Sequence, residues 1–201
     1  MDPKAVTKAR ARLRIARQQL EAAEKSASYH AFTDAWYLFL VAAKNVYTTL
    51  EQGAKASAQS RQWFGGKKND RKSDELLQYL FQARDDDEHG LADVTMLNPG
   101  FLGIGKAAEG FSHSMSISMS TDEHGTPTIH KLESHDGLPI LIEQKGPHAV
   151  LLPVTGRSSI RYDVPTQHLG KPLPDDLPLT VGKLGLAYLE ALVAEAEARA
   201  A

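Results

Sequence analysis

The chain has 201 residues, enough for one sizeable core or for two small units packed together. Hydrophobic residues make up 42% and charged residues 24%, which is ordinary for a soluble globular protein, and a net charge of −2 supplies no global field toward nucleic acid or membranes. The absence of cysteine excludes disulfides, thiolate catalysis and cysteine-ligated zinc.

Two long helices are predicted at the start of the chain. In residues 3–28, apolar residues recur at steps of three and four, Pro3 suits a first turn and Asp2 can cap it. Residues 31–55 are apolar over most of a helical circumference, which is typical of the central helix of a bundle.

A polar segment separates these helices from a third. Residues 56–73 contain Gly65-Gly66, so we expect a loop or a broken helix there. Ser73 is a plausible cap for a helix that carries SDELLQYLFQARDDDEH and ends at Gly90.

The later part of the chain predicts strands. SMSISMS, residues 114–120, alternates Met and Ile with Ser, which indicates a half-buried strand. Turn signals separate further predicted strands at residues 127–133, 138–144, 148–154 and 157–164. A helix is expected again at the end of the chain.

This order predicts an α+β fold: an N-terminal up-and-down helical bundle, then a small antiparallel β-meander and a C-terminal helix. The expected divisions are a bundle over 1–97, a connector over 98–110, a meander over 111–168, a proline-rich link over 169–178 and a helix over 179–201 that can pack back on the bundle.

The stretch QARDDDEHG, residues 82–90, has two interpretations. On a helix, Asp85 and His89 are four residues apart and face each other, and Arg84 and His89 can border one groove. Equally, His89 suits the negative end of a helix, Gly90 suits its C-terminal position, and the acids form a solvated face.

A metal site is a weaker interpretation of the same stretch. Asp86 and His89 have the i, i+3 spacing of a carboxylate–histidine ligand pair. The sequence holds no second acid-x-x-His pair on the first two helices, so the ligand set is incomplete. We therefore expect no metal and no cofactor.

The segment RQWFGGKKNDRK combines basic and aromatic residues. Such a segment can hold a phosphate backbone and stack a base. It can also be a solvated loop whose Trp63 is buried in the core of the bundle, since large aromatic side chains are usually buried. The candidate RNA-binding residues are Arg61, Trp63, Lys67, Lys68, Arg71 and Lys72.

The order of an apolar helix, RQWF and SDELLQYLFQARDDDEH resembles the HEPN superfamily of small helical bundles. Arg84, Asp85 and His89 match its signature as R-D-x-x-x-H. The resemblance covers about the first 92 residues, and the strand region and the last helix have no counterpart in it.

The resemblance implies a metal-independent endoribonuclease, or an RNA-binding module, of a defence or toxin–antitoxin type system that acts as a homodimer through the bundle. His89 would be the general acid or base, Arg84 would stabilise charge on the phosphate, and Asp85 would orient His89 or raise its pKa.

The four acids from Asp85 to Glu88 depart from the family pattern and would repel RNA. The alternative is therefore a non-catalytic dimerisation or protein-interaction module, with a protein partner bound by the meander. No apolar run reaches the roughly 18 residues of a membrane span, and the N-terminus lacks a secretory signal, so no membrane partner and a cytoplasmic location are expected.

Overall fold

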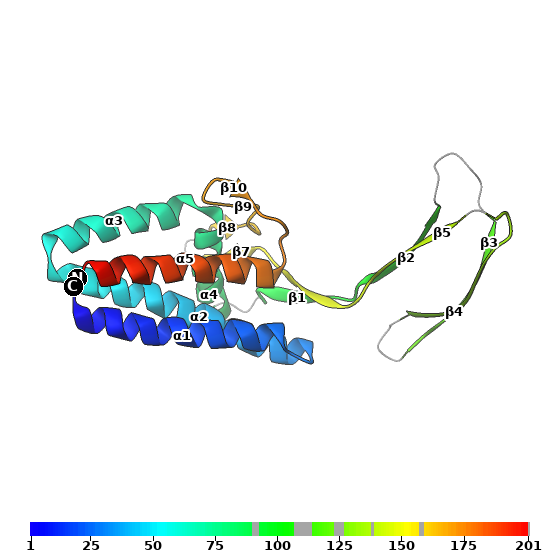
Figure 1. The fold of residues 1–201 in the computed structure, drawn as a ribbon, viewed down its shortest axis with the longest axis horizontal. Coiled ribbons are helices and arrows are strands. Elements are labelled where there is room, and N and C mark those ends of the chain that lie inside the picture. The colour runs from blue at the N-terminus through cyan, green and yellow to red at the C-terminus, as the bar shows by residue number, and fades with distance from the viewer. Residues whose placement is uncertain (90–92, 107–113, 123–126, 138, 157–158, 201) are drawn as a thin grey trace. The chain divides into compact units, whose positions relative to one another are not determined.

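The structure is a computed structural model that describes the chain except residues 90–92, 107–113, 123–126, 138, 157–158 and 201; for residues 86–89, 105–106 and 144 it describes the backbone only. The chain divides into two compact units (Figure 1). Met1–Met96 with Val150–Ala201 forms the helical unit, and Leu97–Ala149 forms what we call the β arm. The α+β class predicted from the sequence is confirmed.

The helical unit is built from long helices joined by short turns. Their core is centred on α2, where Trp36, Phe39, Leu40, Val46 and Leu50 are almost completely buried. The helices are α1 (Pro3–Glu24), α2 (Tyr29–Gly53), the short 3-10 helix η1 (Ala54–Ala56), α3 (Ala58–Ser73), α4 (Glu75–His89) and α5 (Pro178–Ala198).

Helix α1 packs against both α2 and α5, and it is the lowest helix in Figure 1. Its buried residues follow steps of three and four and include three alanines, whose small side chains allow close helix packing: Val6, Ala9, Leu13, Ala16, Leu20 and Ala23. Exposed ion pairs join α1 to α5: Arg10–Glu197 at 2.6 Å, Arg17–Glu190 at 2.5 Å and Glu24–Lys183 at 2.5 Å. Such exposed pairs fix the register of the helices more than they add to stability.

The expected loop or broken helix at 56–73 was wrong, because α3 is helical through both glycines. The Ser57 hydroxyl caps its first turn by accepting from the Ser60 amide, and Phe64 is buried against the Tyr47 ring. Packing and a cap therefore outweigh the low helix propensity of two adjacent glycines.

Replacing Gly66 with alanine is expected to raise the free energy of unfolding by about 0.5–1 kcal/mol, the helix-propensity difference between these residues. A Cβ at this position would meet no atom within 4 Å. Urea unfolding measures the change. Gly53→Ala is the contrasting variant, because its Cβ would lie 2.4 Å from Ala5 Cβ and should destabilise the chain. Destabilisation by Gly66→Ala would contradict a helical α3.

Asp74, rather than the predicted Ser73, caps α4. Its carboxylate accepts from the Leu77 amide at 2.8 Å, and it also accepts from the Leu169 amide at 2.6 Å and contacts His168 Nδ1 at 3.0 Å. Asp74 is buried, so it fastens the chain at 168–169 onto the start of α4. Residues 150–168, predicted as part of the meander, thus belong to the helical unit.

The strands pair in a nested order. β1 pairs with β6, β2 with β5 and β3 with β4, whereas β7–β8 and β9–β10 are short pairs in the helical unit. The predicted connector at 98–110 contains the whole of β2, which the sequence did not predict. The bounds are β1 (Thr95–Asn98), β2 (Phe101–Lys106), β3 (Met115–Thr121), β4 (Pro127–Ser134), β5 (Ile140–Lys145), β6 (His148–Leu151), β7 (Val154–Thr155), β8 (Arg161–Tyr162), β9 (Gln167–His168) and β10 (Lys171–Pro172).

Candidate functional site

The R-D-x-x-x-H motif lies at the C-terminal end of α4. Leu76, Tyr79 and Ala83 bury one side of this helix, so the chain is held as a helix up to the motif. Arg84 and Asp85 are described in full. His89 is the last residue of α4, and its side chain lies outside the described residues.

Asp85 is buried in a charged cluster rather than on a solvated face. Its carboxylate accepts from Lys44 Nζ of α2 and from Arg84 Nη1, the latter at 3.1 Å. The side chains of Asp85, Lys44 and Arg84 are 10%, 14% and 18% exposed. Lys44 also lies 4.3 Å from the centroid of the Phe81 ring, which gives the ammonium a second favourable contact. We call Lys44, Arg84 and Asp85 the motif cluster.

The motif cluster shows contacts of two predicted site residues. Asp85, predicted to orient His89, accepts from Lys44 and Arg84, and the His89 side chain lies outside the described residues. Arg84, predicted to stabilise charge on a phosphate, contacts Asp85. The sequence did not identify Lys44, although a lysine within the apolar VAAKNVY stretch is a signal that could have done so.

The basic residues of α3 are mostly engaged within the chain. Trp63 Nε1 donates to Glu195 Oε2 at 2.9 Å, and Lys67 Nζ pairs with Glu195 Oε1 at 2.7 Å. Lys68 pairs with Glu51 of α2. Two of the predicted RNA-binding cations are thus matched by carboxylates.

The other predicted RNA-binding residues have different surroundings. Arg61 is exposed and donates to the Lys55 carbonyl at 3.2 Å, and Lys72 is exposed. Arg71 instead turns toward aromatic rings, lying 3.8 Å from the Phe81 centroid and 5.2 Å from that of Tyr47. The structure does not bring the six residues together as one exposed basic face.

Replacing Glu195 with glutamine should lower stability near neutral pH and have progressively less effect as the pH falls. The hydrogen bond from Lys67 lowers the pKa of Glu195, with help from Trp63. A pKa that is lower in the folded state means that the carboxylate stabilises the fold above its ordinary pKa of 4.5, and that this contribution is lost as the pH falls through the folded value.

Melting temperatures of both proteins from pH 3 to pH 8 test this expectation. The difference between them should shrink on the acid side. A constant difference across this range would contradict the role of the Glu195 charge. Glu190→Gln is a matched control, since it changes an α5 glutamate whose pair with Arg17 is exposed.

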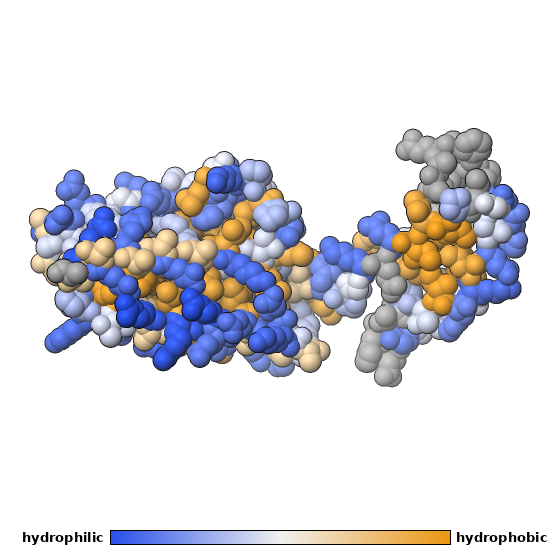
Figure 2. Space-filling view, in the orientation of Figure 1, coloured by the Kyte–Doolittle hydropathy of each residue, from blue (hydrophilic) through white to orange (hydrophobic). Residues whose placement is uncertain are grey.

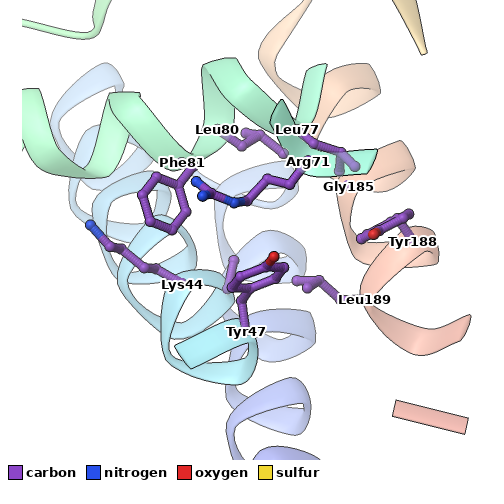
Figure 3. Close-up of a pocket in the computed structure, with 10 residues that line it drawn as sticks. Lys44, Tyr47, Arg71, Leu77, Leu80, Phe81, Gly185, Tyr188 and Leu189 are labelled. Carbon is purple, nitrogen blue, oxygen red and sulfur yellow. The ribbon is translucent and has the colours of Figure 1, made fainter. Parts of the chain in front are cut away.

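A small cavity of about 40 Å³ adjoins the motif cluster between α2, α3, α4 and α5. Figure 3 shows Arg71 extending between Phe81 and Tyr47, with Lys44 on one side and Tyr188 and Leu189 on the other. Burial raises the pKa of both Tyr47 and Tyr188, so both phenols are neutral at physiological pH. Neither tyrosine was predicted from the sequence, because both lie on largely apolar helices where no local pattern marks them.

Among the described residues, no group of three His, Asp or Glu side chains could hold an ion. The predicted weak pair, Asp86 and His89, falls on side chains outside the description.

No protein-family model, curated protein or solved structure matches this chain. The HEPN resemblance therefore stays a prediction from the motif and its preceding helices. Among the described residues, no helix has the length and apolar character needed to cross a bilayer.

Proposed function

We propose that this chain is a non-catalytic, HEPN-like assembly module that associates with a second copy of itself through the β arm. The observation that carries the proposal is that none of the described residues of the β arm is buried. Several large apolar side chains there are 40–57% exposed: Leu97, Phe101, Ile117, Met119, Leu141 and Ile142.

The β arm needs another surface to cover its exposed apolar side chains. Isolated two-stranded ribbons are marginal in water, and contiguous exposed apolar surface marks interaction sites. Figure 2 shows a continuous apolar patch on the β arm. Burying such a patch against another molecule supplies the core that the described residues of the arm do not form.

The β3–β4 hairpin has two chemically distinct faces. Ile117 lies opposite Leu132, and Met119 lies opposite Ile129, so apolar side chains from both strands share one face. The other face carries Ser116 and Ser118 opposite Glu133 and Lys131, which form an ion pair at 2.9 Å. These four residues need not lose water when the apolar face is covered, because they lie on the opposite face of the ribbon.

A second copy is the partner that best fits the apolar face. A symmetric contact places the same patch on both sides of the interface, so each face must complement itself. A face of Ile, Leu and Met without charged side chains satisfies this requirement, because apolar packing is non-directional. Another copy is also present wherever the chain is.

The motif cluster supports the non-catalytic part of the proposal. An arginine that stabilises a transition state must offer its donors to the substrate, whereas Arg84 Nη1 donates to the Asp85 carboxylate. Asp85 also accepts from Lys44 of α2. That arrangement stabilises the packing of α4 on α2.

Sedimentation equilibrium of the full chain tests the assembly. We expect a dimer at micromolar concentration, together with no metal-free cleavage of single-stranded RNA above background. A chain that stays monomeric up to about 100 μM would contradict the proposal.

An RNA endonuclease is the second candidate function. It is favoured by the 18% exposure of the Arg84 side chain and by its place on the same helix as His89. This candidate requires metal-independent cleavage that His89→Ala abolishes and that the control His30→Ala leaves intact. His30 is suitable because its side chain is 91% exposed on α2.

A further inference from the structure

The cavity between α2, α3, α4 and α5 is lined by apolar side chains but also by polar atoms with no hydrogen-bond partner among the described residues. These atoms are Tyr47 Oη, Tyr188 Oη and Arg71 Nε. Tyr47 is 4% exposed. Buried polar groups are nearly always satisfied in folded proteins, so three such atoms around one cavity indicate a missing partner.

The charges around the cavity define that partner. Lys44 is paired with Asp85, and the nearby carboxylates of Glu51 and Glu195 are paired with lysines. Two further acids lie near Tyr188, Asp70 and Asp74, and Asp74 contacts His168. Asp70 is exposed on α3.

Arg71, in contrast, makes no ion pair within the described part of the chain; its guanidinium lies over the faces of Phe81 and Tyr47 and close enough to the Tyr47 hydroxyl to oppose the rise that burial causes in its pKa. The cavity is therefore lined by two cations, Arg71 and the Lys44 that pairs with Asp85, and by two neutral hydroxyl donors, and no acid lines it.

We propose that this cavity binds a small organic monocarboxylate. The carboxylate would accept from Arg71 Nε and from the hydroxyls of Tyr47 and Tyr188, and its short apolar body would lie against Leu77, Leu80 and Leu189.

Size and chemistry both limit the ligand. A water-sized group needs about 10–15 Å³ of this kind of volume. A cavity of about 40 Å³ therefore accommodates roughly three such groups, and its open side accommodates the remainder of the ligand. A guanidinium matches a planar carboxylate, whereas the apolar walls disfavour a more strongly hydrated dianion such as phosphate.

Propionate and its neutral isostere propionamide are the probes for the full-length chain. We expect propionate at millimolar concentration to raise the melting temperature, and propionamide to have no effect. Calorimetric titration should show propionate binding that is weakened at least about tenfold in Tyr188→Phe, because a hydrogen bond to a charged group is lost. Equal effects of the two probes, or no effect of propionate, would overturn the proposal.

Stability without ligand supplies a second readout. Removing a buried, unsatisfied hydroxyl should raise the melting temperature of Tyr188→Phe in ligand-free buffer. Tyr79→Phe is the matched control: its hydroxyl donates to the Leu152 carbonyl at 2.7 Å, so its removal should lower the melting temperature and leave propionate binding unchanged. Unchanged propionate affinity in Tyr188→Phe would show that the hydroxyl takes no part in binding and would refute the site.

Discussion

Replacing Asp85 with alanine is expected to lower the free energy of unfolding by about 3 kcal/mol, because breaking a buried ion pair leaves its charges without compensation. Asp85 is 8% exposed and accepts from both Lys44 and Arg84. Chemical denaturation followed by circular dichroism measures the loss. It would be a large fraction of the stability of an ordinary domain.

Two further variants distinguish a buried pair from a general effect of removing an acid. Asp34→Ala removes a 67%-exposed carboxylate from α2 and should change stability by less than about 0.5 kcal/mol. Lys44→Met combined with Asp85→Leu should recover part of the loss, because an apolar side chain replaces the buried Lys44 charge and only Arg84 loses the Asp85 carboxylate. A loss below about 1 kcal/mol in Asp85→Ala would show that the cluster does not brace α4 against α2.

The same variant bears on the motif. If Asp85 serves mainly to orient His89, its replacement should change catalysis much more than stability. If the motif cluster only stabilises the fold, Asp85→Ala should lower stability, and the wild-type chain should show no RNA cleavage. Stability and cleavage measured on one preparation of Asp85→Ala therefore separate the two candidate functions.

The sequence predicted the α+β class and the long helices because their signals are periodic and local. The steps of three and four from Val6 to Ala23 repeat over the whole of α1. The alternation in SMSISMS likewise identified a strand, found as Met115–Thr121. It misled about burial, since Ile117 and Met119 are 40% and 49% exposed. Alternation distinguishes the two faces of a strand but does not supply the partner that covers one of them.

The features that the sequence missed depend on contacts between distant residues. The acids after Arg84 suggested a solvated face, whereas Asp85 meets Lys44, which lies 41 positions earlier. Gly65-Gly66 suggested a break, yet α3 is tied to α5 through Glu195, 128 positions after Lys67. The nested pairing of β1 with β6 has no local signature either. Local propensity is a weak prior that such tertiary contacts override.

The largest expected effect on assembly comes from the apolar face of the β3–β4 hairpin. Replacing Ile117 and Met119 together with serine should weaken self-association at least about 100-fold, because fully burying each such side chain contributes roughly 1.5–3 kcal/mol. Both are exposed in one copy of the chain, and serine already alternates with them along β3, so the strand itself should tolerate the change.

The control for this variant lies on the opposite face of the same strand. Ser116→Ala with Ser118→Ala changes two exposed residues that face Glu133 and Lys131, and should alter the dimer dissociation constant less than about threefold. Sedimentation equilibrium of the wild-type chain and both double variants gives the three constants. Similar dissociation constants for the two double variants would place any dimer contact away from this face. An effect confined to the Ile117 and Met119 variant would instead show that the β arm buries its apolar side chains against a second copy.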